Sequence, residues 1–458
     1  MSTDDPQLII SAALMHGLGM HLGAWMAREG EASDYVSGSL YREIARAAEA
    51  GKLHALFLAE SITNQEQGAE RPAGCFDTAT VLALMAGVTD RIGLVGTAST
   101  TYNQPYDVAR RFATLDHLSD GRAGWNSVAT QNTVVAQVFG GGEHPDHEDR
   151  YERADEFIDV VIRLWESWEE GALVGDKANA LFAREDMIHE VSHSGKYFKV
   201  RGTLPFARSR QGRPVIFQAG ASPRGREQAA KFADVVFTAQ HLIEGALEFR
   251  GDIRDRVAAN GRDPDSIKVL PGVSVILGAT ETEARQRKQH LEDVLGAGPH
   301  LEKLARRVGL PVDALQDLDA PFPAHLLGPD EEFKGSIGFR RSIVSLAVKE
   351  NMTVRQLVAN YGGGHQQIVG TPEQVADMMQ EWLRAGAADG FTLMIDMLPS
   401  GIHQVTELLV PELQCRGLFH TEYEHDTLRS SLGFPPRWPS HRPLGAWHRN
   451  DRSNLEST

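Results

Sequence analysis

The stretch PVIFQAGASPRGREQAAKFADVVFTA, residues 214–239, decides the fold. Two short apolar runs, 214–220 and 234–239, flank a more polar segment. That segment favours a helix, because Ser222 can cap it and Pro223 can occupy its first turn. A strand, a helix and a second strand in this order are typical of parallel strands joined by a crossover helix. The stretch therefore predicts one unit of an α/β fold.

Apolar runs of the same kind recur along the chain, and each is followed by a longer amphipathic stretch. The eight runs are 8–14, 53–59, 92–99, 121–129, 214–220, 234–239, 268–278 and 391–397. Eight strand and helix units favour a closed (β/α)8 TIM barrel over an open sheet. The clearest helices are predicted at 105–118, 148–168 and 371–386.

Two stretches, at about 169–213 and 279–370, do not follow this repeat and are predicted to be insertions in the barrel. Long excursions from a compact barrel are usually lids or binding loops. We predict one domain over residues 1–435 that carries both insertions. The tail from about residue 420 is rich in Arg, Pro and Ser, which is typical of a surface arm, and residues 436–458 form the arm beyond the domain.

The charge balance and the cysteine content exclude several classes of protein. Among 458 residues, 46 Lys and Arg face 62 Asp and Glu, and the net charge of -16 disfavours nucleic acid and anionic membranes as partners. Only Cys75 and Cys415 are present, too few for a disulfide framework, which predicts a reducing, cytoplasmic location. The acidic N-terminus does not resemble a signal peptide, and no apolar run is long enough to cross a bilayer.

Polar residues follow several of the predicted strands, where a barrel places its active site. They are Glu60, Ser61, Thr97, Ser99, Thr100, Thr101, Asn126, Thr130 and residues 220–222. Each of them alone can be a cap or turn residue. Their common position at the carboxyl ends of strands nevertheless favours a shared site.

The segment QAGASPRGRE, residues 218–227, is a candidate phosphate site. The N-terminus of the helix that Ser222 caps would present unpaired backbone N–H groups and the positive end of its dipole. Gly220 and Gly225 allow close approach, and Arg224 or Arg226 adds charge. An ordinary turn between a strand and a helix explains the same residues equally well.

The segment HPDHED, residues 144–149, mixes two histidines with three acidic residues. Its spacing is not helical and no further cluster supports it, so we predict no metal site. His147 and Tyr151 lie four residues apart at the start of a helix, where both rings can reach one ligand. A second polar and aromatic group near the first strand comprises His16, His21 and Trp25. A structural histidine is the alternative in each case.

Five long segments carry a family resemblance. They are GKLHALFLAES (51–61), RRFATLDHLSDGRAGWNSVAT (110–130), HEDRYERADEFIDVVIRLW (147–165), the stretch from HSGKYF to FTA (193–239) and GTPEQVADMMQEWLRAGAADGF (370–391). In this order they resemble the bacterial-luciferase-like flavin monooxygenases. Within that superfamily they are most similar to the group of nitrilotriacetate monooxygenase component A, pristinamycin IIA synthase and dibenzothiophene-sulfone monooxygenase.

The resemblance implies a two-component monooxygenase that is a homodimer or homotetramer. Its FMN would arrive already reduced, as FMNH2, from a separate NAD(P)H:flavin reductase. With O2 the reduced flavin would form a C4a-(hydro)peroxyflavin that oxygenates a small organic substrate. The glycine-rich stretches 140–142 and 362–364 lack the strand followed by GxGxxG that marks a dinucleotide-binding domain, which agrees with a separate reductase.

The resemblance also assigns residues to the site. The flavin contacts of similar proteins fall on Glu60, Thr97, Thr130, Tyr151, Ala221 and Ser222, with His147 close by. Glu60 stands where relatives usually have Asp, and Thr130 keeps a hydroxyl where they have Ser. His21 and His147 are the candidate catalytic acid or base residues, since histidine exchanges protons near neutral pH.

The second insertion is expected to cover the pocket with Arg340, Arg341 and His365. The two arginines either pair with an anionic substrate or are simply solvated. Two other functions stay open. One is a deazaflavin-dependent dehydrogenase of the same fold, and the other is a catalytically silent flavin-binding subunit.

Overall fold

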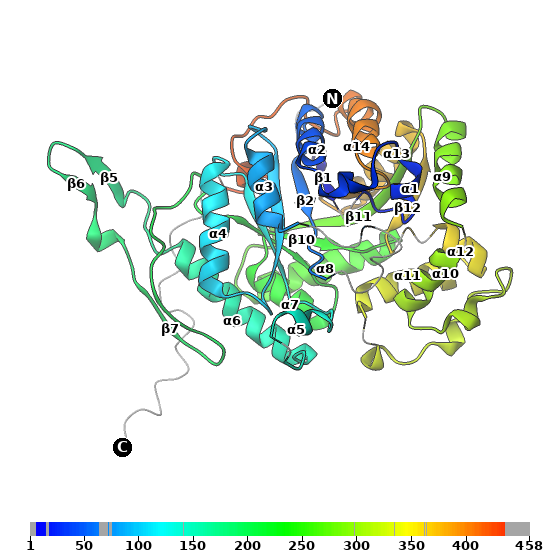
Figure 1. The fold of residues 1–458 in the computed structure, drawn as a ribbon, viewed down its shortest axis with the longest axis horizontal. Helices are drawn as coiled ribbons and strands as arrows, with labels where there is room; N and C mark the ends of the chain where they lie inside the picture. The colour runs from blue at the N-terminus through cyan, green and yellow to red at the C-terminus, as the bar shows by residue number, and fades with distance from the viewer. Residues whose placement is uncertain are drawn as a thin grey trace, which may run out of the picture.

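Eight parallel strands close into a barrel (Figure 1). The computed structural model describes residues 6–14, 18–63, 72, 76–140, 142–296, 298–333, 335–360, 362 and 364–435. The barrel strands are β1 (Ile9–Leu14), β2 (Ala55–Leu58), β3 (Gly93–Ser99), β4 (Ala123–Val128), β9 (Val215–Ala219), β10 (Val235–Thr238), β11 (Lys268–Leu277) and β13 (Gly390–Ile395). They follow one another around the ring in this order, and β13 pairs with β1 to close it. The predicted (β/α)8 barrel is confirmed, and each predicted run contains or overlaps its strand.

Helices cover the outside of the barrel, and most of them begin at a side-chain cap or at a proline. The longer ones are α2 (Gly38–Ala50), α3 (Thr78–Ala86), α4 (Pro105–Leu118), α6 (His147–Trp165), α7 (Pro223–Phe232), α8 (Ile243–Ala259) and α13 (Pro372–Ala385). The helices α4, α7 and α13 have proline in the first turn, where a missing N–H costs nothing. Residues after β13 continue as α14 (Ser400–Gln404), a π-helical stretch (Val405–Leu409) and α15 (Val410–Cys415). The three predicted helices are confirmed.

The strands separate two apolar clusters because successive side chains point to opposite faces. Outside the barrel, Trp125 of β4 is fully buried against Phe157 and Trp165 of α6, at ring distances of 6.0 and 5.9 Å. Inside it, Phe57 lies 6.1 Å from Phe217 and stacks on another strand's aromatic ring. The aromatic rings fill the interior, so a ligand must bind at an end of the barrel.

The amino-terminal end of the barrel is closed by the short helix α16 (Leu428–Ser431). Leu428 and Leu432 are 0 % and 2 % exposed and belong to the interior cluster with Phe434. The expectation of a surface arm from about residue 420 is therefore wrong for residues 427–434, because apolar side chains of this part plug the barrel, whereas residues 421–426 are mostly exposed. The predicted arm proper, 436–458, lies outside the described residues, and the domain boundary at 435 stays a prediction.

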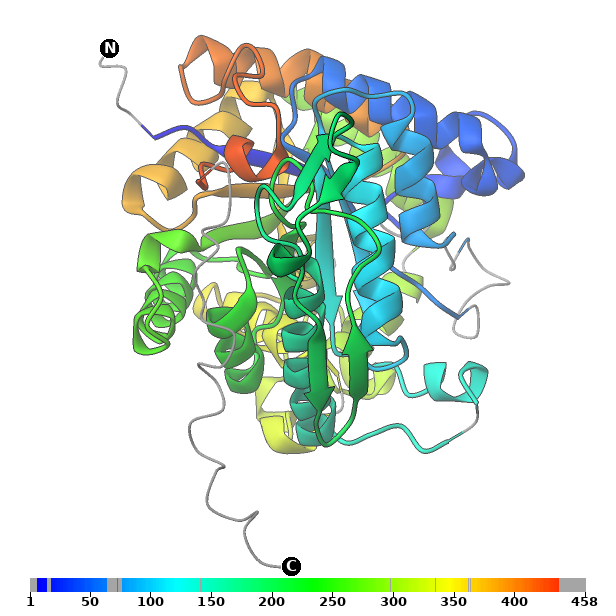
Figure 2. The ribbon, with the colours of Figure 1, turned by 90° about the vertical axis from the view of Figure 1, so that its left-hand side faces the viewer.

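The first insertion, predicted at 169–213, forms two antiparallel hairpins. Their strands are β5 (Leu173–Asp176), β6 (Leu181–Ala183), β7 (Val191–Ser194) and β8 (Lys199–Gly202). The β5/β6 hairpin projects away from the barrel in Figure 1, and Figure 2 shows both hairpins on the side that faces the viewer. The β7/β8 hairpin contacts α6, where His193 and Glu156 are 2.8 Å apart. The β5/β6 hairpin therefore extends away from the barrel, whereas the tip of the β7/β8 hairpin reaches the first turn of α6, where the Tyr197 hydroxyl donates to Asp149 at 2.6 Å.

The second insertion, predicted at 279–370, gathers on the opposite side of the molecule (Figure 1). It contains α9 (Glu281–Leu295), α10 (Gly298–Val308), α11 (Ile337–Lys349), α12 (Val354–Asn360) and β12 (Gln366–Gly370). The strand β12, which the sequence did not predict, pairs with residues 273–277 of β11. β13 pairs with one edge of β11. Along the other edge, β10 pairs with residues 268–271 and β12 takes over from residue 273. The insertion thereby borders the carboxyl end of the barrel.

Among the described residues, no helix is both long and apolar enough to cross a membrane.

Candidate active site

A hydrogen-bonded group of polar side chains lies at the carboxyl ends of β3 and β4. The Thr97 hydroxyl donates to the Leu58 carbonyl at 2.8 Å, and Asn126 Nδ2 donates to the same hydroxyl at 2.9 Å. Ser99 and Thr130 share a hydrogen bond of 2.7 Å. Asn126 is only 3 % exposed, and its Oδ1 has no hydrogen-bond partner within the described part of the chain. A buried amide oxygen left unpaired in this way suits a ligand that donates to it.

Glu60 lies beside this group, just beyond β2. Burial raises the pKa of its carboxyl to about 7, and the nearby Asp77 carboxylate adds to the effect. Arg111 and the backbone N–H of Ser99 partly oppose the rise. A substantial fraction of Glu60 is therefore protonated near neutral pH, and in that form it can donate a hydrogen bond as well as accept one.

The N-terminus of α7 forms a narrow cradle at the end of β9. The Ser222 hydroxyl caps the helix by accepting from the backbone N–H of Gly225 at 3.0 Å. The Tyr151 phenol reaches this point from α6, and burial raises its pKa, so that it stays protonated as a donor. A Cβ at Gly225 would lie 3.0 Å from the Tyr151 hydroxyl and 3.1 Å from Ser222 Oγ. The glycine keeps the cradle open, and α7 directs its dipole into it.

His147 and Tyr151 face the same region from the first two turns of α6, with ring centroids 4.9 Å apart. The predicted common face of this pair is confirmed. Burial, and next the Arg150 charge, lower the pKa of His147, so the ring is neutral at neutral pH. Arg224 is held by Glu148 and Asp155 at 3.2 and 3.0 Å. Its charge is therefore largely offset within the chain.

The HPDHED segment has a structural role. Asp146 caps α6 by accepting from the Asp149 backbone N–H at 2.8 Å. His144 accepts or donates a hydrogen bond with Tyr102 at 2.7 Å and contacts Arg150. The described residues contain no group of three His, Cys, Asp or Glu side chains that would hold a metal ion.

The second insertion reaches the mouth through α11 and the start of β12. A Cβ at Gly338 of α11 would lie 2.4 Å from the Ala221 Cβ, so the helix packs directly on the turn that precedes α7. His365 is 1 % exposed, and its ring lies 5.4 Å from that of Phe237 inside the barrel. Gly272 makes room for that ring, since a Cβ there would approach it to 2.4 Å. His365 thus fills one side of the barrel mouth.

The two arginines predicted to pair with a substrate or to be solvated differ in exposure. Arg340 is 4 % exposed and pairs with Asp330 at 3.1 Å, while also donating to the carbonyls of Gly328 and Pro329. Arg341 pairs with the same carboxylate at 2.7 Å. Both arginines therefore hold a loop of the insertion in place; Arg340 is buried and not solvated, whereas the Arg341 side chain is 55 % exposed, as the solvated alternative predicted.

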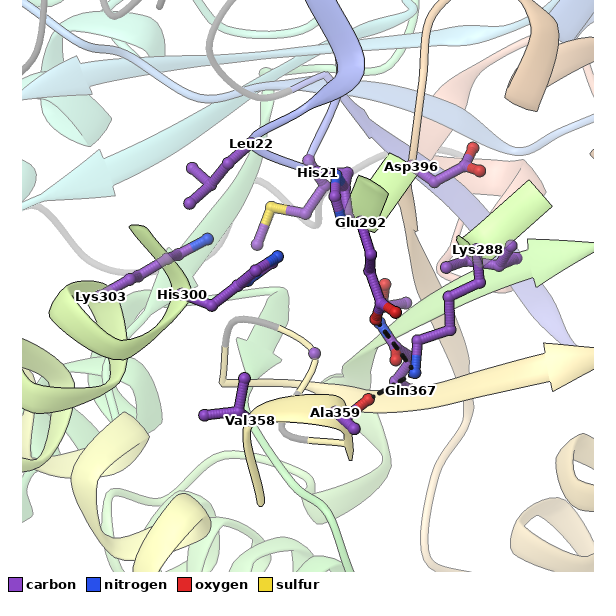
Figure 3. Close-up of a pocket in the computed structure, with 14 residues that line it drawn as sticks. His21, Leu22, Lys288, Glu292, His300, Lys303, Val358, Ala359, Gln367 and Asp396 are labelled. Atoms are coloured by element: carbon purple, nitrogen blue, oxygen red, sulfur yellow. Dashed lines mark hydrogen bonds and ion pairs between the residues drawn. The ribbon is translucent and has the colours of Figure 1, made fainter. Parts of the chain in front are cut away.

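His21 lies on another arc of the mouth, in a small cavity beyond β1 (Figure 3). Its Nδ1 accepts from the Gly23 backbone N–H at 3.0 Å, and its ring packs against that of His300 at 5.3 Å. Burial, and then the charges of His300, Lys303 and Lys288, lower the pKa of His21 to about 3. The ring is therefore neutral at neutral pH and cannot serve there as a protonated acid. His16, the other predicted histidine of this region, lies outside the described residues.

The residues at the mouth fit a flavin mononucleotide. The α7 cradle with Ser222 and Tyr151 offers donors to a phosphate, and the unpaired Oδ1 of Asn126 offers an acceptor to a ribityl hydroxyl or a ring N–H. Gln218, at the end of β9, likewise has an Oε1 without a partner among the described residues. The sequence identified Asn126 only as one polar residue among several, and Gln218 only as part of the QAGASPRGRE segment, because an unpaired oxygen has no signature in the sequence.

Comparisons with known proteins bear on the same regions. Residues 20–389 match the family model described as luciferase-like monooxygenase. The chain is 43 % identical to nitrilotriacetate monooxygenase component A of Aminobacter aminovorans, across 91 % of this chain and 94 % of that one. It is 40 % identical to N-acetyl-S-(2-succino)cysteine monooxygenase of Bacillus subtilis (strain 168), across 94 % and 98 %. Among solved structures it resembles riboflavin lyase with modified FMN and riboflavin, with a TM-score of 0.80, 30 % identity and coverage of 95 % and 98 %.

Proposed function

The chain belongs to the luciferase-like monooxygenase family, and from this premise we propose that it is the oxygenase of a two-component system. It would use FMNH2 and O2 to oxygenate a small organic substrate. The observation that carries the proposal is the α7 cradle, where the Ser222 cap and the Tyr151 phenol meet at the helix N-terminus. The cofactor supplies the oxygen chemistry when it is bound.

The chain's own residues would bind and orient that cofactor. Ser222 and Tyr151 would hold the phosphate, with Ala221 at the turn and His147 beside it. Thr97, Thr130 and Glu60, on the neighbouring strand ends, would position the ribityl chain and the ring. Asn126 would accept one hydrogen bond through its unpaired Oδ1. The insertion helix α11, which packs on Ala221, would keep water from the site.

The acid and base roles of the two histidines stay proposals. With their lowered pKa values, both His21 and His147 are neutral at neutral pH, so each would act first by accepting or sharing a proton. Replacing each by Ala and measuring single-turnover oxygenation at saturating flavin tests this. Unchanged rates in both variants would remove both residues from the mechanism.

The remaining parts of the proposal concern partners. A separate NAD(P)H:flavin reductase would deliver the FMNH2, as the name "component A" of one relative suggests. We further propose a homodimer or homotetramer in the cytoplasm. Light scattering on the purified chain tests the oligomer directly.

The cradle is tested by measuring the affinity for FMNH2 under anaerobic conditions. Tyr151→Phe and Ser222→Ala should each weaken binding about tenfold, the usual effect of losing a hydrogen bond to a charged group. Thr280→Ala is the matched control, because Thr280 caps α9 in the same way through the Glu283 backbone N–H at 3.2 Å. It should cost similar stability and leave flavin binding unchanged. Equal losses of affinity in all three variants would count against the cradle.

The reaction is tested by adding a flavin reductase, NAD(P)H and ¹⁸O₂ to the purified chain with a panel of organic acids, sulfones, alkanes and heteroaromatics. Incorporation of one ¹⁸O atom into a product supports the proposal. Selective binding of a deazaflavin would favour the dehydrogenase alternative. Release of peroxide with every candidate, without any product, would favour the silent subunit.

A further inference from the structure

We propose that the cavity beyond β1 binds a carboxylate of the substrate, so that this enzyme acts on small organic acids. The inference rests on the proposed function for the reaction, although the anion site can be tested without it. The cavity lies between β1, β11 and β13 on one side and the insertion helices α9, α10 and α12 on the other. Its volume of about 40 Å³ admits a small polar group and excludes a flavin ring system.

Two lysines give the cavity its charge. Lys303 projects from α10 on one side, and Lys288 from α9 lines the other and donates to the Ala359 carbonyl at 2.7 Å (Figure 3). Two acidic residues also border the cavity. Asp396 is held by Arg287, with its two oxygens 2.5 and 3.0 Å from the guanidinium, so its charge is offset. Glu292 lies 3.5 Å from Lys288, which leaves a net positive cavity.

Two histidines add neutral hydrogen-bonding groups. Burial, followed by the Lys303 and Lys288 charges, lowers the pKa of His300 to about 4. His21 is neutral at neutral pH for similar reasons. Because its Nδ1 accepts from the backbone, the proton of neutral His21 is on Nε2, which is then a donor. The buried Nε2 of His300 has no partner in the described part of the chain, although it borders a polar cavity.

The position of the cavity suits a substrate anion. The proposed flavin contacts lie on β2, β3, β4 and β9, which are consecutive in the ring, whereas the cavity lies at β1, β13 and β11 on the other arc. A substrate whose carboxylate occupied this cavity would extend its remaining atoms toward the centre of the mouth. The lysines are also well placed to fix its orientation, since a carboxylate and two ammonium groups attract over several ångströms in a partly buried site.

Calorimetry on the full-length chain at low ionic strength tests this with succinate and tricarballylate as probes. Both acids should bind, and their neutral amides should bind at least tenfold more weakly. Lys303→Gln and Lys288→Gln should each raise the Kd of the acids about tenfold, as expected for the loss of a charged hydrogen-bond donor. Glu292→Gln should lower it about threefold, because it removes the nearest negative charge. A gain of affinity cannot come from misfolding.

The matched control is Lys349→Gln. Lys349 lies on α11 of the same insertion, is 48 % exposed and pairs with Glu244 at 2.9 Å, so its loss changes the net charge equally without changing the cavity. Its Kd values should equal those of the unaltered chain. FMN affinity, measured separately, should stay within twofold in the cavity variants, because the cavity lies outside the flavin contacts.

Several outcomes would overturn the inference. They are a Kd above about 10 mM for both acids, equal binding of acids and amides, no effect of either lysine variant, and binding of inorganic phosphate alone. A fall in FMN affinity with the lysine variants would also overturn it, by assigning the cavity to the flavin. Acid binding that depends on the lysines in a chain that binds no FMN would retain the anion site and refute the oxygenase proposal instead.

Discussion

The two ends of the same barrel bury polar groups of different kinds. At the amino-terminal end, Asp234 is fully buried and accepts from Arg429 at 3.2 Å, from Arg213 at 3.4 Å and from the Ile216 backbone N–H at 2.9 Å. At the carboxyl end, Asn126 keeps a buried oxygen without a partner among the described residues. The closed end therefore pairs opposite charges within the chain, although Asp234 Oδ1 also has no hydrogen-bond partner among the described residues, whereas Asn126 at the mouth is a neutral group.

The pKa values show the same contrast. Burial alone would raise the pKa of Asp234, but Arg213 and Arg429 outweigh it, so the pKa is lowered and the carboxylate stays charged. At the mouth, burial dominates, raising the pKa of Glu60 and lowering that of His21. The closed end thus keeps its buried carboxylate charged, whereas Glu60 and His21 at the mouth are partly or wholly neutral at neutral pH, so that a ligand can engage them. Mutations should therefore be able to change the stability of this barrel and its affinity for ligands separately.

The largest expected effect is at the closed end. Asp234→Ala would leave two buried guanidinium groups without their carboxylate and should cost about 3–5 kcal/mol of unfolding free energy. Chemical denaturation followed by circular dichroism measures this. Asp265→Ala is the control, because Asp265 pairs with Arg254 at 2.8 Å but is 78 % exposed, and its loss should leave the midpoint nearly unchanged. Similar losses in both variants would contradict the assigned role of burial.

The second-largest loss of stability is expected in the apolar plug around α16. Leu428→Ala removes a fully buried side chain that lies against Gly93, where a Cβ would come within 2.4 Å of it. The cavity that remains should cost about 2–4 kcal/mol, with little change in flavin affinity. Leu118→Ala, at a 66 % exposed position of α4, should change stability little. If Leu428→Ala weakened flavin binding as strongly as stability, the two ends would not be independent.

At the mouth, a mutation should reduce flavin affinity more than stability. Asn126→Ala loses the bond to Thr97 and should cost only about 1 kcal/mol of stability, while FMN binding weakens about tenfold because the unpaired acceptor is gone. Asn260→Ala is the control, since Asn260 Nδ2 donates to the Arg256 carbonyl at the end of α8. It should cost similar stability without a change in flavin affinity. Unchanged FMN binding by Asn126→Ala would show that its oxygen faces no ligand.

The sequence predicts the barrel because parallel strands buried on both faces are continuous apolar runs, and the cap of α7 because Ser222 and Pro223 form a local signal. It fails at α16, where the polar composition of the tail conceals Leu428 and Leu432. The ion pair that buries Arg429 joins it to a residue 195 positions away. A composition-based prediction has no access to such a partner.

The cavity could not be predicted for the same reason. It joins His21, near the start of the chain, to Lys288 and Lys303 in the insertion and to Asp396 after the last strand. Each residue alone is an ordinary polar residue near a helix or a loop. The strand β12, which supports this region, was missed because its residues are half-exposed and two of them are glutamines. The cavity is formed by residues that are distant in the sequence, so no local pattern marks it.

The smallest effect concerns Glu60 and depends on pH. In the folded chain the Glu60 pKa is about 7, above its ordinary value of 4.5. Between pH 4.5 and pH 7 the folded state therefore keeps a proton on Glu60 that the unfolded state has lost. Stability from this group is therefore fully present below pH 4.5 and is lost as the pH rises to about 7. Glu60→Gln, which stays neutral, should match the unaltered chain at pH 4.5 and exceed its stability by about 1–2 kcal/mol at pH 8.

Thermal unfolding of both proteins at the two pH values measures this difference. Glu152→Gln is an informative contrast, because hydrogen bonds from Lys196 and Tyr197 lower the pKa of Glu152, so its contribution is present at pH 8 and is lost as the pH falls. The two variants should thus shift the pH dependence in opposite directions. If Glu60→Gln gave no gain at pH 8, the carboxyl would be better solvated than its burial implies, and Glu60 would not serve as a protonated donor to the flavin.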